Sequence, residues 1–174
     1  MDISALKAIS PIDGRYSKQT QILSGYFSEH ALMKYRVWVE IEYFIALCEI
    51  PLPQLNSVTT AQHESLRKVY WEMSDDDVLR IKELESTTNH DVKAVEYWLR
   101  DRFRANREVS AAAEFIHFAC TSEDINNLAY GLMLRRALSE CLLPEIDTLL
   151  GVLRESAERH AEVPMLSRTH GQTA

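Results

Sequence analysis

The sequence is poor in the residues that interrupt helices. Of its 174 residues only five are glycine and five are proline, and neither type occurs between residues 54 and 130. This scarcity excludes collagen-like structure and favours a helical chain, because Gly and Pro are the strongest local breakers. The sequence shows no convincing alternation of a strand, no internal repeat and no low-complexity tract. We therefore expect an all-α fold.

The chain also lacks an excess of positive charge and a long hydrophobic run. Nineteen Lys and Arg stand against 26 Asp and Glu, for a formal net charge of -7. A surface of that sign repels polyphosphate, so we expect no nucleic-acid partner. The longest apolar run, Tyr43 to Cys48, falls far short of the roughly 20 residues that cross a bilayer. The N-terminus also lacks a basic stretch that leads into an apolar one. The sequence therefore predicts a cytoplasmic protein without a membrane partner.

Short motifs of several enzyme classes are missing. Cys48, Cys120 and Cys141 are too far apart for a zinc pair or a redox Cys-x-x-Cys motif, and we expect buried thiols. The chain has no glycine-rich loop of the kind that holds dinucleotides or nucleoside triphosphates. A serine nucleophile elbow is also missing.

Helical periodicity and capping signals divide the chain into segments. The broad apolar stripe of residues 28–50 predicts a helix buried on more than one side. Capping pairs predict helix starts at Thr59 and Ser74. Further helices are expected to begin at Asn89 or Asp91, at Ser110 (running through Phe118) and at Thr121. Pro144 either kinks this last helix or starts a second one in line with it.

The polar stretch of residues 104–110 is the best candidate for a domain boundary. It would separate an N-terminal helical domain, residues 1–108, from the start of a central helical-bundle domain, residues 109–174. The second part ends on an arm whose apolar face has no partner, followed by a polar loop. Because a bundle helix needs neighbours to bury such a face, we expect the chain to be a fragment.

Three polar clusters adjoin helix ends, at residues 87–91, 121–124 and 167–173. A helix start offers free N–H groups and a positive dipole end, so such places favour phosphate or carboxylate. Thr, Ser and Asn side chains add neutral donors. Simple helix capping is the alternative interpretation of each cluster.

Two of the six histidines lie in these clusters. His90 and His170 could exchange a proton near neutral pH beside a bound anion. His30, His63 and His160 are expected at the surface, and His117 as a hydrogen-bonded core residue. Metal binding by His90 with Asp91 is disfavoured, because adjacent side chains splay apart and no third ligand is evident nearby. We therefore expect no metal.

Four collinear motifs carry a family resemblance: SPIDGRY at residues 10–16, TTNHDVKAVEY at 87–97, FIHFACTSEDINN at 115–127 and SRTHGQ at 167–172. Together they resemble the bacterial type of adenylosuccinate lyase, within the fumarase and aspartase superfamily. The likeness spans the whole chain. It implies a fumarase/aspartase-like helical fold and a part in purine nucleotide (AMP) biosynthesis.

The resemblance implies β-elimination of fumarate from adenylosuccinate, giving AMP, and from a succinylaminoimidazole carboxamide ribotide. It implies no metal or organic cofactor, a purine nucleotide substrate, and a homotetramer whose sites each combine three subunits. A base takes the proton next to a carboxylate, donors hold the resulting charge, and the leaving nitrogen is protonated.

Family roles fall on positions of this sequence that match the motifs. His170 matches the general acid, and His90 a residue that binds or orients substrate and assists proton transfer. The matched substrate contacts are Arg15, Tyr16, Asn89, His90, Asp91, Thr121 and Ser122. The family's base is a serine in a Ser-Ser-x-Met-Pro-x-Lys-x-Asn loop, which this sequence does not contain, so we expect this chain alone to be inactive.

Two other interpretations stay open. One is another fumarate-releasing lyase, such as one acting on argininosuccinate; the residues around Arg15 and Asn89 favour the purine branch. The other is a non-catalytic helical interaction module, which gains force if the gene ends at Ala174.

Overall fold

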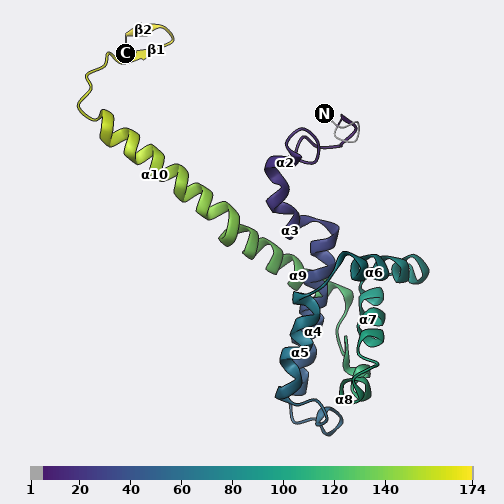
Figure 1. Ribbon diagram of the computed structural model, residues 1–174. Helices are drawn as coiled ribbons and strands as arrows, with labels where there is room; N and C mark the ends of the chain where they lie inside the picture. The colour runs from purple at the N-terminus through teal and green to yellow at the C-terminus, as the bar shows by residue number, and fades with distance from the viewer. Residues whose placement is uncertain (1–5, 174) are drawn as a thin grey trace. The chain divides into compact units, whose positions relative to one another are not determined.

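The computed structural model describes residues 6–173, which form two compact units, residues 6–137 and residues 138–173 (Figure 1). The predicted boundary between residues 108 and 109 lies inside the first unit. Compactness and domain architecture are different properties, so that boundary stays a prediction. Among the described residues no helix combines the length and apolar character needed to cross a membrane.

The first unit is built from helices joined by short turns. Their order is α2 (Ser17–Thr20), η1 (Gln21–Leu23), α3 (Ser24–Phe27), α4 (Glu29–Cys48), η2 (Pro53–Leu55), α5 (Thr60–Trp71), α6 (Asp75–Thr88), α7 (Asp91–Arg102), α8 (Arg107–Ala111), η3 (Ala113–Phe115) and α9 (Ser122–Ala137). The expected all-α class is thereby confirmed for this unit.

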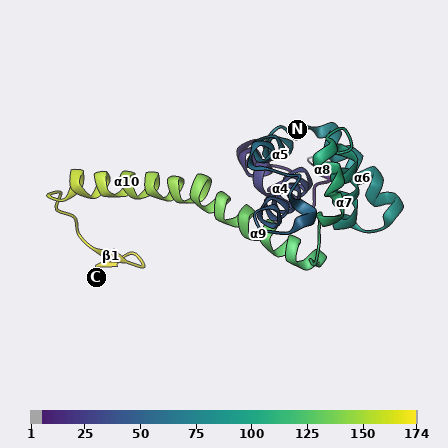
Figure 2. The same cartoon turned by 90° about the horizontal axis from the view of Figure 1, so that it is seen from below.

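Helix α4 lies at the centre of the first unit, in contact with α5, α6, α7 and α9 (Figure 2). Its broad apolar stripe serves two separate clusters. Val37, Ile41 and Phe44 join the larger cluster with α5 and α7, whereas Tyr35 and Val39 join a smaller one with α9. The expected burial on more than one side is confirmed.

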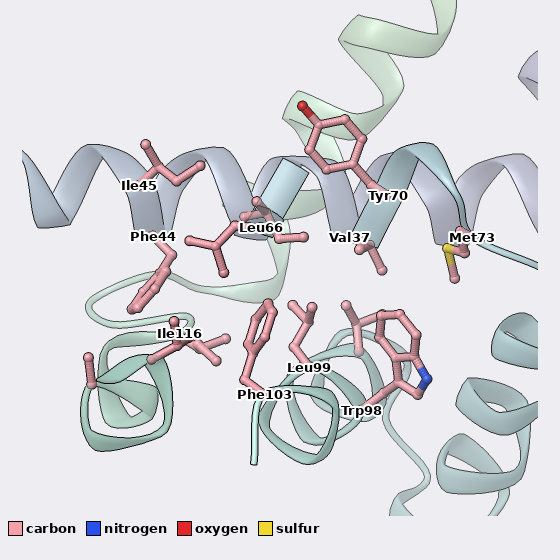
Figure 3. Close-up of a cluster of buried hydrophobic side chains, with 14 of the residues drawn as sticks. Val37, Phe44, Ile45, Leu66, Tyr70, Met73, Trp98, Leu99, Phe103 and Ile116 are labelled. Atoms are coloured by element: carbon pink, nitrogen blue, oxygen red, sulfur yellow. The ribbon is translucent and has the colours of Figure 1, made fainter. Parts of the chain in front are cut away.

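The larger cluster forms the main core. Figure 3 shows Val37 and Phe44 of α4 facing Leu99 and Phe103 of α7, with Leu66 of α5 between the layers. Side chains from three helices therefore interlock, and we expect this packing to hold α7 firmly against α4.

Local capping signals decide where most of these helices begin. Both predicted capping boxes are present, at Thr59 with Gln62 and at Ser74 with Asp77. The prediction for Ser110 was wrong. Asn106 caps α8 instead, its Oδ1 accepting the Val109 N–H at 3.1 Å, and the helix ends at Ala111 well before Phe118.

The structure corrects the predicted exposure of one histidine and shows how far each cysteine is buried. His63, expected at the surface, is 7% exposed, because α5 packs against α4. His30 is half-buried and His160 exposed. Of the three free cysteines, Cys141 is buried, and the other two, at positions 48 and 120, are half-buried.

The second unit begins with the π-helical segment η4 (Leu138–Leu142), followed by α10 (Leu143–His160). Pro144 lies in the first turn of α10, directly after the π-helical segment. Strands β1 (Arg168–Thr169) and β2 (Gln172–Thr173) pair antiparallel. The sequence pattern gave no sign of this hairpin, since two residues per strand are too few for an alternation.

Candidate functional site

The first polar cluster, residues 87–91, contains the two-residue connection between α6 and α7. Asn89 ends α6 in the left-handed region, with φ 55°, and its N–H bonds the Glu85 carbonyl at 2.8 Å. Asn adopts this conformation more readily than most residues because its short polar side chain bonds locally. His90 then returns to extended backbone as the N-cap of α7.

Both ring nitrogens of His90 are engaged. Nδ1 accepts the Lys93 N–H at 3.2 Å, and Nε2 lies 3.3 Å from Ser122 Oγ. Since an accepting Nδ1 carries no proton, the hydrogen-bond network assigns the proton of the neutral ring to Nε2, which donates toward the serine. The imidazole side chain is 50% exposed, so it can meet both solvent and a ligand.

The second polar cluster forms the start of α9. Thr121 donates from its N–H and from Oγ1 to Asp124 Oδ2, at 2.7 and 2.9 Å. These bonds hold the pKa of Asp124 below its usual range. The Thr121 hydroxyl is therefore occupied by its own cap, and the hydroxyl that reaches the first cluster belongs to Ser122.

A buried arginine of α4 bonds to the starts of both α7 and α9, next to the two clusters. Arg36 of α4 is 4% exposed, forms an ion pair with Asp91 Oδ2, and donates from Nε to Asn126 Oδ1 at 2.8 Å. Sequence reasoning missed this residue. The available signal was a charged side chain between Tyr35 and Val37, inside the apolar stripe of residues 28–50.

An open hollow of about 500 Å³ adjoins the first cluster. It is lined by Lys82, Glu85, Ser86, Asn89, His90 and Asp91. Lys82 Nζ bonds Glu85 at 2.6 Å and Glu29 at 3.0 Å, and these bonds raise the pKa of the lysine. Within residues 6–173 no three His, Cys, Asp or Glu side chains are grouped to hold a metal ion.

The loop before α9 is anchored by a second buried charge of α4. Glu40 is 0% exposed, and its Oε1 lies 2.6 Å from His117 Nδ1. The expected hydrogen bond of His117 is confirmed, but the residue is half-buried and does not belong to the core. Burial raises the pKa of Glu40. His117 and Ala119 both have positive φ, 61° and 57°, so this loop is bent sharply just before Thr121.

The third polar cluster lies in the second unit and forms the β1–β2 turn. His170 and Gly171 occupy its two central positions with φ 48° and 77°. Positive φ at both positions is the twist that a tight hairpin requires, and Gly adopts it without strain. The exposed His170 ring contacts Thr169 Oγ1 through Nδ1 at 3.1 Å.

The structure thus brings together part of the predicted site. His90 and Ser122 meet in the first unit, with Asn89, Asp91 and Thr121 beside them in the chain. Arg15 and Tyr16, both exposed, contact each other: the guanidinium carbon lies 5.3 Å from the ring centre. The places of Arg15, Tyr16 and His170 in a common site stay predictions.

The first unit is helical and brings two donor-rich helix starts into contact. Sequence comparison gives the class of protein. The profile of a family described as "Lyase" matches residues 14–174. The chain therefore belongs to this lyase family.

Among individual proteins, the chain is similar to enzymes named adenylosuccinate lyase. It is 47% identical over 175 residues to that of Legionella pneumophila (strain Corby), 47% over 178 residues to that of Dictyostelium discoideum, and 43% over 180 residues to that of Escherichia coli (strain K12). Each alignment covers 100% of this chain and 38% of the relative. The chain thus spans well under half the length of these relatives, and the resemblance read from its motifs is confirmed.

Proposed function

We propose that these residues are the N-terminal part of an adenylosuccinate lyase. The reaction would be β-elimination of fumarate from adenylosuccinate, giving AMP, and from the related succinylaminoimidazole carboxamide ribotide. A base removes the proton next to a carboxylate, the carbon–nitrogen bond breaks, and the departing nitrogen takes up a proton. No metal or organic cofactor enters this proposal.

The observation that supports the proposal best is the 3.3 Å contact between His90 Nε2 and Ser122 Oγ. Residues 32 positions apart in sequence, each at the start of a helix, face one another. Helix starts offer N–H groups and a positive dipole end to anions, and the substrate carries a phosphate and two carboxylates. Local charge, rather than the net charge of -7, governs such binding.

Within this proposal each site residue has a role. Ser122 donates to the succinyl carboxylates, and Thr121 does so when its hydroxyl turns away from Asp124. His90 orients the substrate and assists proton transfer, and His170 protonates the leaving nitrogen. The remaining substrate contacts are Arg15, Tyr16, Asn89 and Asp91. The serine base lies outside the sequence described, so a complete site needs further chain.

Assembly is part of the same proposal. The outward apolar residues of α10 are 40 to 57% exposed within this chain: Ile146, Leu149, Leu150 and Leu153. Helices with such a face bury it against neighbours in a bundle. We propose that the complete protein is a homotetramer in which α10 belongs to the central bundle.

A spectroscopic assay of the complete protein tests the function. We expect the wild type to convert adenylosuccinate to AMP and fumarate and to leave argininosuccinate intact. His170→Ala should lower kcat by roughly 100- to 10,000-fold, the usual contribution of one acid–base group. His30→Ala, which removes an imidazole of α4 that is 38% exposed and pairs with Asp75, is the control and should keep wild-type turnover. Near-normal turnover by His170→Ala would refute the assigned role.

A further inference from the structure

Arg36 is a charged side chain in an apolar position. It lies on α4 between Tyr35 and Val37, which are 2% and 0% exposed, and is itself 4% exposed. A guanidinium loses its hydration when it is buried to this extent, and proteins accept that cost only where hydrogen bonds replace the water. The bonds that Arg36 makes therefore indicate what it is for.

Those bonds join two helices that are separate in sequence. Nη2 forms an ion pair with Asp91, the first residue of α7, and Nε donates to Asn126 of α9 at 2.8 Å. Nη1 points at the Met33 sulfur, 3.8 Å away, within α4. One planar, rigid group thus holds the starts of α7 and α9 against the same point of α4.

His90 and Ser122, whose side chains meet, each lie close in sequence to a residue that Arg36 binds. His90 immediately precedes Asp91, and Ser122 lies one helical turn before Asn126. Fixing Asp91 and Asn126 therefore fixes the distance between His90 Nε2 and Ser122 Oγ. We infer that Arg36 is a positioning residue, which sets the separation of the two donor clusters without touching the substrate.

The same geometry gives the Asp91 carboxylate a structural role beside the substrate contact proposed from its motif. Oδ1 accepts the Val92 N–H at 2.8 Å and Oδ2 pairs with Arg36. An unpaired carboxylate would repel an anionic ligand at this helix start, and the guanidinium neutralises it. Asp91 thus belongs to the junction that Arg36 organises. The effect on catalysis rests on the proposed function, whereas the effect on geometry does not.

Variants of Arg36 in the complete protein test the inference. Arg36→Met removes both bonds, and Arg36→Lys keeps a charge for Asp91 but cannot also donate in the fixed fork to Asn126. We expect kcat/KM for adenylosuccinate to fall about 100-fold in Arg36→Met and about 10-fold in Arg36→Lys, because small misplacements of reacting groups are costly. Activity is measured well below each variant's melting temperature.

Arg67→Met is the matched control. Arg67 donates to Glu42 of α4 from Nε and Nη2, at 2.8 and 2.9 Å, on the side of α4 that packs against α5. This variant also breaks an arginine–carboxylate pair of α4, so its melting temperature should fall. Its kcat/KM should stay within about threefold of wild type, since no bond to α7 or α9 is lost. If folded Arg36 variants were as active as this control, the inference would be overturned.

A structural measurement separates the inference from the proposed function. In crystal structures of the wild type and of Arg36→Lys, we expect the His90 to Ser122 contact of 3.3 Å to be kept in the first and lost in the second. An unchanged contact in Arg36→Lys would overturn the positioning role. If the wild type failed to cleave adenylosuccinate while the contact still depended on Arg36, the proposed function would fall and the inference would stand. Should Arg36→Met fail to fold, Arg36→Lys alone decides.

Discussion

His90 has two separable roles, because one ring nitrogen caps a helix and the other faces Ser122. Nδ1 accepts the Lys93 N–H at 3.2 Å, which satisfies one of the free donors at the start of α7. Replacing a capping residue by alanine costs about 1 kcal/mol, whereas asparagine is among the best N-caps. We therefore predict that His90→Ala destabilises the protein by about 1 kcal/mol and that His90→Asn restores most of this loss.

Catalysis should not follow stability in this pair of variants. Neither alanine nor asparagine can supply the imidazole N–H that points at Ser122, so both should lose activity, by roughly 100-fold or more if the ring assists proton transfer. Thermal unfolding followed by circular dichroism measures the first quantity, and the lyase assay the second. His30→Ala serves as the control for removing a partly exposed imidazole outside the proposed site.

The result that would refute this reasoning is a parallel change of both quantities. If His90→Asn regained activity together with stability, the imidazole would serve only as a cap. If His90→Asn were as unstable as His90→Ala, the Lys93 bond would not contribute as the geometry requires.

Three further predictions concern stability. Burial raises the pKa of Glu40 in the fold, so its contribution to stability is fully present below the ordinary value of 4.5 and is lost as pH rises through the raised value. The stability of wild type relative to Glu40→Gln, measured by urea unfolding, should therefore fall as pH rises above 4.5. A relative stability that rises with pH would contradict this. Leu99→Ala should lower the free energy of unfolding by about 2 to 5 kcal/mol in the same assay, because Leu99 is 1% exposed in the main core. A loss under about 1 kcal/mol would contradict this and show that the core closes over the gap. Gly171→Ala forces a side chain into φ 77° and should strain the hairpin by about 1 to 2 kcal/mol, with lower lyase activity in the complete protein; unchanged activity would argue against a role for the turn geometry.

The fold was largely predictable where the signal is local. The Thr59 and Ser74 capping boxes depend on residues three positions apart, so the sequence displays them directly. The predicted helix start at Ser110 was wrong because Asn106, a residue of equal capping ability, lies earlier in the same polar stretch. The predicted exposure of His63 was wrong for a different reason. Its sequence neighbours are polar, but packing of α5 on α4 buries its side chain.

The candidate site was predictable only in part. The clusters around His90 and Ser122 could be predicted because the residues that cap a helix start lie next to one another in the sequence. Arg36 was missed because its partners lie 55 and 90 positions away, and no periodicity joins residues at such distances. A charged residue inside an apolar stripe is the trace that a buried ion pair leaves in sequence.

Helix α4 carries Arg36 and Glu40 one turn apart, and each holds a different polar loop. Inserting or deleting one residue between them would rotate one by about 100° relative to the other and shift it by about 1.5 Å. The guanidinium could then no longer meet Asp91 while the carboxylate meets His117. Homologous chains should therefore keep the spacing between these two charges unchanged.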